Sequence, residues 1–267
     1  MRLFVLGSNG MLGRYVSVYF KSLNYDVVDV TRKMLDATKA TTTNFNSIIK
    51  GDVVINCIGV IKQRKKVSPL DFILVNSALP WVVANHCESV GAKLIHPSSD
   101  CVFLGVKGLY NEKDFHDAVD IYGRSKSLGE PDNCCVIRTS IIGEEKYNKK
   151  SLLEWVKSNK DKEVDGYTNH FWNGITCLQF AKVCATIING NLYWNGVQHI
   201  YSPVVFSKFA LVKLISEVYN LNVKVNPKAT SIMCDRTLLS VSKNNIVIPP
   251  LEDQLIELRS LSETILS

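Results

Sequence analysis

The chain has 267 residues, of which 46% are hydrophobic and 21% are charged, and its formal net charge is +6. This composition excludes an intrinsically disordered protein, and the length fits one large α/β domain with a smaller appendage. No apolar run reaches the roughly 18 residues that a membrane span needs, so we expect a cytoplasmic protein without a membrane partner.

The cysteines and the basic residues give no sign of a metal or of nucleic acid. The eight cysteines are scattered without C-x-x-C spacing, which predicts reduced core thiols, no disulfide framework and no metal site. Basic residues form isolated doublets, such as Lys149 and Lys150, and no long basic arm. Mild basicity of this kind suits a small polyanionic ligand, and we expect no nucleic-acid partner.

Strand-like and helical patterns alternate through the first half of the chain. Strands are predicted at residues 3–6, 27–30, 53–57, 93–96 and 135–138, and helices at 11–23 and 72–90. The N-terminal segment is predicted to form the first of these strands and not a signal peptide. This alternation predicts an α/β fold with a doubly wound parallel sheet, which binds ligands at the carboxyl ends of its strands. From about residue 146 the segments shorten, which predicts a smaller C-terminal lobe.

A glycine-rich turn follows the first predicted strand. Its glycines allow a tight turn, a close approach of backbone N–H groups to a pyrophosphate, and packing of the next helix on the sheet. The strand, the glycines and the helix stand in the order that a dinucleotide site requires. We therefore predict cofactor binding by the whole stretch GSNGMLG, which comprises Gly7, Ser8, Asn9, Gly10, Met11, Leu12 and Gly13.

The choice of cofactor is predicted from the end of the second strand, where NAD enzymes place an acidic residue. Here Thr31 and Arg32 leave the strand, so no carboxylate repels a 2′-phosphate and Arg32 can pair with one. The rival is Asp29 as a ribose ligand, but strand alternation directs it to the same face as Val27, away from the tip. We expect NADPH in preference to NADH.

Tyr122 and Lys126 lie four positions apart in a segment that can be helical, so both project from one face. An ammonium near a phenol lowers the phenol pKa toward neutrality, as a proton donor to a developing alkoxide requires. The segment follows a strand that ends near Ser99, whose hydroxyl can donate to a substrate carbonyl. Together the three residues predict a carbonyl-reducing site, against the alternative of a surface tyrosine and a solvated lysine.

These motifs together resemble the extended short-chain dehydrogenase/reductases, and among them the dTDP-4-dehydrorhamnose reductase family. The resemblance covers residues 1 to about 145 and includes DVVINCIG, KLIHPSSDCVF, Tyr122–Lys126 with SLGE after it, and VIRTSIIG. It implies a Rossmann NADP-binding domain over 1–145 and a lobe over 146–267 that mainly binds substrate, with some segments returning to the Rossmann core.

The family resemblance also implies an activity and residue roles. The activity is hydride transfer from NADPH to C4 of a nucleotide-linked 4-keto-6-deoxyhexose, carried by UDP or dTDP. Ser99 would orient the carbonyl, Tyr122 would donate the proton, and Lys126 would hold the nicotinamide ribose. Further cofactor contacts implied by the resemblance are Asp36 on the adenine side and Cys57, Ile58, Gly59 and Asn76.

Cys101 departs from a plain reductase and resembles a cysteine of GDP-L-fucose synthase, which epimerises its substrate before reducing it. That enzyme pairs the cysteine with a histidine of the later lobe, for which His170 is the candidate here. Hydrogens flanking a keto group are acidic, so a thiolate and an imidazole could invert C3 or C5. The alternatives, a small core cysteine and a structural histidine, stay open.

The later lobe is predicted to bind the nucleotide-diphosphate ketosugar, because aromatic rings stack on sugars or bases and arginine clamps phosphates. For Trp172, the alternative to substrate binding is packing in the core. The predicted substrate contacts are Ser99, Asp100, Cys101, Trp172, Asn173, Lys208 and Arg236.

Two other functions remain open. One is a catalytically idle NADP-binding partner, since the regulatory subunit of methionine adenosyltransferase has this fold; the presence of Ser99, Tyr122 and Lys126 speaks against it. The other is an NAD-dependent sugar epimerase or dehydratase, which would favour an acidic residue in place of Thr31. A homodimer is compatible with each of these functions.

Overall fold

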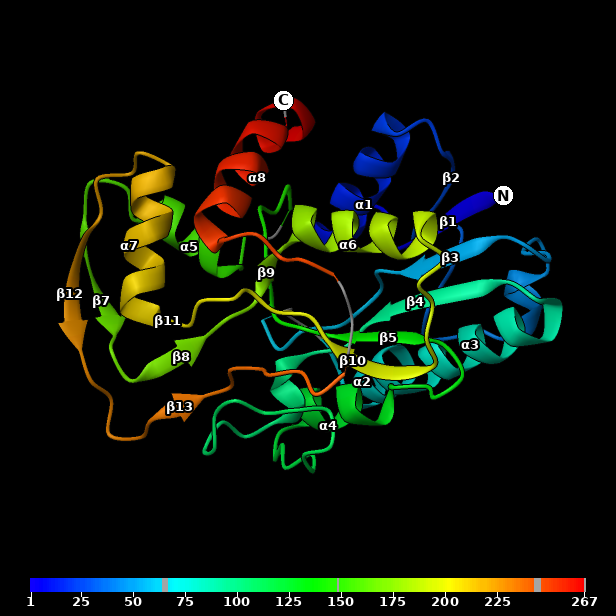
Figure 1. The fold of residues 1–267 in the computed structure, drawn as a ribbon, viewed down its shortest axis with the longest axis horizontal. Helices are drawn as coiled ribbons and strands as arrows, with labels where there is room; N and C mark the ends of the chain where they lie inside the picture. The colour runs from blue at the N-terminus through cyan, green and yellow to red at the C-terminus, as the bar shows by residue number, and fades with distance from the viewer. Residues whose placement is uncertain (64–66, 148, 243–245, 267) are drawn as a thin grey trace.

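A six-stranded parallel sheet forms the centre of the molecule in the computed structural model, which describes residues 1–63, 67–147, 149–242 and 246–266 (Figure 1). The α/β fold with a doubly wound parallel sheet is confirmed. Its strands are β1 (Arg2–Leu6), β2 (Asp26–Val30), β3 (Val53–Asn56), β4 (Lys93–Pro97), β5 (Cys135–Arg138) and β10 (Gly196–His199).

The strand order is β10-β5-β4-β3-β1-β2. The chain leaves β1 toward β2 on one side and resumes with β3 on the other side of β1, so the order reverses there. In such a sheet, ligands bind outside the carboxyl ends of the strands at this reversal. The five strands predicted from the sequence are all present, and β10 is a sixth, contributed by the later part of the chain.

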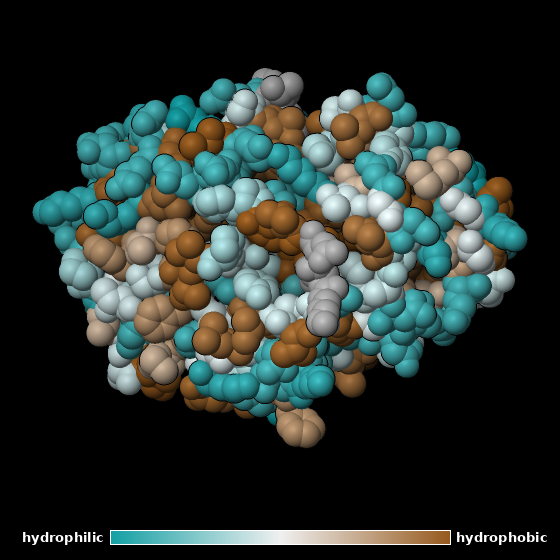
Figure 2. All heavy atoms as spheres, viewed as in Figure 1, coloured by the Kyte–Doolittle hydropathy of each residue, from teal (hydrophilic) through white to brown (hydrophobic). Residues whose placement is uncertain are grey.

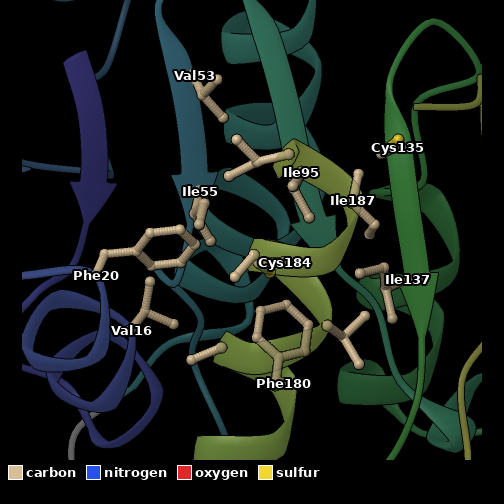
Figure 3. Close-up of a cluster of buried hydrophobic side chains, with 14 of the residues drawn as sticks. Val16, Phe20, Val53, Ile55, Ile95, Cys135, Ile137, Phe180, Cys184 and Ile187 are labelled. Atoms are coloured by element: carbon tan, nitrogen blue, oxygen red, sulfur yellow. The ribbon is translucent and has the colours of Figure 1, made fainter. Parts of the chain in front are cut away.

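One face of the sheet is covered by α1 (Met11–Ser22) and α6 (Cys177–Asn189). Figure 3 shows Val16 and Phe20 of α1 and Phe180 of α6 pointing at Ile55 and Ile95 of the sheet. Alternate strand residues face these helices because side chains of a strand point to opposite sides in turn. A helix of the later half is thus part of the core around the first half.

The other face packs against α3 (Leu79–Val90) through Val83 and Cys87. The helix predicted over 72–90 is in fact three pieces: α2 (Pro69–Phe72), the π-helical η2 (Ile73–Ala78) and α3. Short π segments inside helices are frequent at functional sites. The remaining elements on this side are η1 (Thr42–Phe45), η3 (Asp100–Val102) and α4 (Ile121–Leu128).

The later lobe lies beyond the carboxyl ends of the strands, at the left of Figure 1. An apolar cluster in this lobe includes Leu153, Leu211 and Leu255. The elements are β6 (Ile141–Ile142), α5 (Leu152–Ser158), β7 (Glu163–Tyr167), β8 (His170–Trp172), β9 (Ile175–Thr176), β11 (Phe206–Ser207), α7 (Lys208–Val218), β12 (Lys224–Lys228), β13 (Cys234–Asp235) and α8 (Leu251–Leu266). The division at residue 145 stays a prediction; β10 and α6 come from beyond it.

The surface in Figure 2 is hydrophilic along its edges, with apolar side chains gathered across the middle of this face. Within the described residues, no helix is both long and apolar enough to cross a membrane. All eight cysteines are free thiols. No group of three or more potential metal ligands gathers in the described part of the chain.

Candidate active site

The glycine turn is built for close approach of a ligand. Gly7 has φ +78°, which an L side chain rarely adopts, and its N–H donates to the Val30 carbonyl at 2.8 Å. A Cβ added at Gly13 would stand 2.8 Å from the carbonyl carbon of Gly7 and 2.9 Å from Cα of Ser8. Only glycine at residue 13 therefore lets α1 start so close to the turn.

Two observations at this turn fit a bound dinucleotide. The N-cap of α1 is Gly10, which offers no side-chain cap, so the first N–H groups of the helix are free to meet an anion. The Ser8 hydroxyl is buried and has no hydrogen-bond partner among the described residues. Buried polar groups in folded proteins are normally paired. The residues present thus fit a cofactor phosphate.

At the tip of β2, Arg32 is exposed and Thr31 is partly buried. Asp29 accepts a hydrogen bond from Lys21 on α1, which places it away from the tip, as strand alternation predicts. Asp36 is exposed and accepts from both the backbone N–H and the hydroxyl of Thr38, and these bonds lower its pKa. Arg32 is thus available to a 2′-phosphate.

The loop after β3 lies against the glycine turn. A Cβ at Gly7 would stand 2.9 Å from the Ile58 side chain and 3.3 Å from the Cys57 carbonyl, so the two predicted cofactor-contacting segments are neighbours. Asn76, in the π segment, binds both backbone groups of Val60, at 2.8 and 2.9 Å, and donates to the Ser125 hydroxyl at 3.1 Å. Its amide therefore connects this loop to α4.

Ser99 follows β4 at the carboxyl edge of the sheet. Its hydroxyl accepts from the backbone N–H of Cys101 at 3.1 Å and donates to Asp100 Oδ1 at 3.2 Å. The backbone on either side is fixed by β5, since Ser98 N–H donates to Ile137 at 2.7 Å and Asp100 N–H to Thr139 at 3.2 Å. A substrate carbonyl would replace Asp100 as the acceptor.

Tyr122 and Lys126 lie on α4, as predicted, and the phenol of Tyr122 interacts with Ser99 and lies near Cys101. Burial raises the pKa of Tyr122, and the prediction of a pKa lowered toward neutrality is wrong for this structure. Burial is the main cause of the raised value, and the Nζ of Lys126 donates to the Pro97 carbonyl at 2.8 Å. Burial lowers the pKa of Lys126 to about 8, and Glu130 opposes this shift.

Cys101 and His170 have different neighbours. Nε2 of His170 lies 2.8 Å from the hydroxyl of Thr230, and its imidazole packs on Tyr167. Burial first, and the negative charge of Asp100 second, raise the pKa of the Cys101 thiol to about 12. A thiol held in this way is a poor base at neutral pH.

Arg236 and Lys208, two of the predicted substrate-binding residues, lie near Asp100. Burial raises the pKa of Asp100, and the charges of Arg236 and Lys208 oppose this shift. Arg236 Nε donates to the Phe103 carbonyl at 2.9 Å, and Lys208 Nζ lies 5.3 Å from the centre of the Trp172 ring. Both cations therefore stand beside the predicted catalytic serine.

Trp172 and Asn173 are buried, each with 4% of its surface exposed. Trp172 belongs to the apolar cluster of the later lobe, and Asn173 makes two hydrogen bonds with the backbone of Leu238, at 2.8 and 2.9 Å. Trp172 and Asn173 therefore have packing roles in the structure. A contact of either residue with the substrate stays a prediction.

A group of polar side chains behind this site was not predicted from the sequence. Arg138, Glu130, His116 and His199 are joined by hydrogen bonds. The only sequence signal was the presence of SLGE and VIRTSIIG among the stretches that carry the family resemblance, and no chemistry pointed to their charged residues.

Comparison with known proteins places the chain in a family. The family model described as the RmlD substrate binding domain matches residues 1–237. The chain belongs to this family.

Three RmlD-like relatives illustrate how far the similarity extends. The dTDP-4-dehydrorhamnose reductase of Mycolicibacterium smegmatis is 33% identical over 132 residues, 48% of this chain and 40% of that protein. Methionine adenosyltransferase 2 subunit beta of Xenopus tropicalis is 26% identical over 252 residues, 82% of this chain and 72% of that protein. The dTDP-4-dehydrorhamnose reductase of Bacillus anthracis in complex with NADP has a TM-score of 0.79 at 22% identity, covering 97% of this chain and 99% of that one.

These similarities support different levels of inference for this RmlD-family chain. The matches to the first curated relatives span about half of those proteins' length, 40% and 53%. At 22% identity, the likeness to the solved reductase shows the fold alone. Membership of the family and the Rossmann-type fold are therefore established.

Proposed function

We propose that this RmlD-family chain reduces the C4 keto group of a nucleotide-diphosphate-linked 4-keto-6-deoxyhexose with NADPH, in the biosynthesis of a rhamnose-like or acetamido deoxysugar. One observation carries the proposal: the glycine turn with its buried Ser8 hydroxyl and the Ser99–Tyr122–Lys126 group lie at the same carboxyl edge of one sheet. A dinucleotide bound at the turn would reach toward these residues.

The cofactor would be held by residues already described. The glycine turn and the start of α1 would bind the pyrophosphate, and Arg32 would pair with the 2′-phosphate. The Cys57–Gly59 loop, held by Asn76, would line the middle of the cofactor. The absence of a carboxylate at Thr31 and the engagement of Asp29 by Lys21 favour NADPH over NADH.

The reduction needs a hydride at C4 and a proton on its oxygen. Bound NADPH supplies the hydride. Ser99 donates a hydrogen bond to the carbonyl and orients it, and the Tyr122 hydroxyl gives its proton to the developing alkoxide. A raised pKa keeps Tyr122 protonated at neutral pH, as a proton donor must be. Lys126, whose Nζ is held by the Pro97 carbonyl, would bind the ribose of the nicotinamide nucleotide.

Epimerisation at C3 or C5 would need Cys101 and His170 to act as a base and an acid on the sugar. The contact of His170 with Thr230 and the raised pKa of Cys101 favour reduction without epimerisation. Running the reaction in D₂O separates the two. Deuterium at C3 or C5 of the product, lost in Cys101→Ser, would establish epimerisation.

The main test offers the purified chain dTDP- and UDP-4-keto-6-deoxysugars with NADPH or NADH and follows absorbance at 340 nm. We expect NADPH oxidation with at least one substrate and its loss in Tyr122→Phe. Absence of turnover on every substrate, by a folded chain that binds NADPH, would contradict the proposal.

A second candidate is an NADP-binding partner protein. The observation that favours it is the match to methionine adenosyltransferase 2 subunit beta, which spans more of this chain than the reductase match does, 82% against 48%. Such a protein would bind NADPH without oxidising it. A chain that binds NADPH, turns over no ketosugar and co-purifies in stoichiometric amount with a methionine adenosyltransferase subunit would support this candidate.

A further inference from the structure

A buried ion pair joins the end of α4 to strand β5. Arg138 donates from Nε to Glu130 Oε1 at 3.0 Å and from Nη2 to Oε2 at 2.6 Å. The side chains are 2% and 5% exposed. Burying two charges has a large desolvation cost and is weak evidence for stability, so the pair points to a role in fixing geometry. Neither residue takes part in the proposed reduction.

Glu130 also holds the end of β4. The hydroxyl of Ser98 donates to Glu130 Oε1, one residue before Ser99. Beyond Arg138, the Thr139 carbonyl accepts from the Asp100 N–H, and before it the Ile137 carbonyl accepts from Ser98. Residues 137–139, at the end of β5, thus carry both the arginine that fixes Glu130 and the backbone acceptors on either side of Ser99.

The same carboxylate acts on Lys126, one turn earlier on α4. Among the described residues no carboxylate is bonded to the Lys126 ammonium, which donates to the Pro97 carbonyl, beside Ser98. The charged and titratable groups around it are Glu130 at the end of its own helix, Tyr122 one turn before it, and His96 on β4. Burial disfavours the ammonium, and the negative charge of Glu130 opposes that effect.

Two histidines complete the coordination of Arg138. Nη1 lies 2.7 Å from His199 Nε2, and Nη2 lies 2.7 Å from His116 Nε2. Since arginine only donates, both Nε2 atoms accept and both imidazoles are neutral. His199 Nδ1 then donates to the backbone carbonyls of Tyr110 and Leu239. The guanidinium therefore also ties down two loops beside the site.

We propose that Glu130 and Arg138 are positioning residues, which hold Ser99 and Lys126 at fixed positions relative to each other through one buried hydrogen-bond network. The two catalytic residues lie on different elements, a strand end and a helix; Glu130 is bonded to Ser98, next to Ser99, and its charge acts on Lys126. This inference rests on the proposed reductase function for its kinetic readout only. The network also predicts the protonation of Lys126, which is measured without turnover.

The test uses Glu130→Gln, which keeps the shape and removes the charge, and Ser98→Ala, which cuts the link to the strand and keeps the ion pair. We expect kcat to fall roughly tenfold to a hundredfold in each, because small misplacements of reacting groups have effects of that size. The KM for NADPH should stay within about threefold, since the glycine turn is untouched. In Glu130→Gln the pKa of Lys126, followed by NMR of ¹³Cε-labelled lysine and assigned with Lys126→Arg, should move below the wild-type value.

The control is Asp52→Asn, which removes another buried carboxylate from an arginine pair, with Arg2, before β3 and away from the carboxyl edge. It should lower the unfolding temperature and leave the Lys126 titration and kcat unchanged. A folded Glu130→Gln protein with wild-type kcat and an unmoved Lys126 titration would overturn the inference. If the wild type reduces no ketosugar, the reductase proposal fails, and the NMR titration still decides whether Glu130 controls Lys126.

Discussion

Gly123 of α4 lies directly against the backbone of Cys101. A Cβ added there would overlap the Cys101 carbonyl oxygen and stand 3.3 Å from its carbonyl carbon. This contact brings the helix that carries Tyr122 and Lys126 up to the strand end that carries Ser99. The absence of a side chain at residue 123 is therefore what allows the three groups to converge.

The first prediction follows from this contact. Gly123→Ala should push α4 away from the strand end, destabilise the fold by about 1–3 kcal/mol and reduce kcat, because overpacked sites relax by backbone shifts. Urea unfolding and NADPH oxidation measure the two effects. Leu128→Ala, at an exposed position of the same helix, is the control and should change neither. Wild-type activity in Gly123→Ala would show that the contact does not position Tyr122.

A second prediction concerns the glycine turn. Gly13→Ala places a methyl group 2.8 Å from the carbonyl carbon of Gly7 and should weaken NADPH binding by roughly tenfold or more, about 1.4 kcal/mol. Quenching of tryptophan fluorescence by NADPH gives the Kd. Ser22→Ala, at the far end of the same helix, serves as control. Unchanged affinity in Gly13→Ala would separate the turn from cofactor binding.

The third prediction tests cofactor choice. Arg32→Ala should lower the affinity for NADPH by about 1.5–3 kcal/mol, the usual contribution of a hydrogen bond to a charged group, and leave NADH binding unchanged. The neighbouring Lys33, also exposed, provides the matched variant Lys33→Ala. Equal losses for both cofactors would mean that Arg32 does not contact a 2′-phosphate.

The sequence predicted the sheet and the groups at its edge, because local patterns encode them. Strand–helix alternation located the five strands, and the glycine spacing located the turn beside Ile58. The proximity of Tyr122 to Ser99 followed from helical spacing combined with the position of a strand end.

The remainder depends on tertiary contacts that leave no local pattern. His170 could be matched to Cys101 only by its place in the later lobe, and the contact of its imidazole with Thr230 has no local sequence signal. The pKa of Tyr122 was mispredicted because burial, and the attachment of Lys126 to Pro97, are properties of the packed structure. Glu130 and Arg138 carry no signal of their pairing, since a turn and a strand separate them.

The last prediction is a pH dependence of stability that originates in the neutral histidines. Burial first, and the charge of Arg138 second, lower the pKa of His199 to about 4, and burial also lowers that of His116. In the unfolded chain a histidine titrates near 6.5, so between that value and 4 the unfolded state binds more protons than the folded state does. Stability is therefore full above pH 6.5 and lost as the pH falls.

For His199 alone, the loss of unfolding free energy between pH 7 and pH 5 should be about 2 kcal/mol, and His116 adds to it in the same direction. Urea unfolding at the two pH values measures it. This window lies above the ordinary pKa of carboxylates, so carboxylates with ordinary pKa values contribute little there. Asp100, whose pKa burial raises, acts in the opposite direction to the histidines. His199→Gln should lower stability at pH 7, where it loses the bond to Arg138, and reduce the difference between the two pH values. A wild-type chain equally stable at pH 7 and pH 5 would contradict a neutral, buried His199.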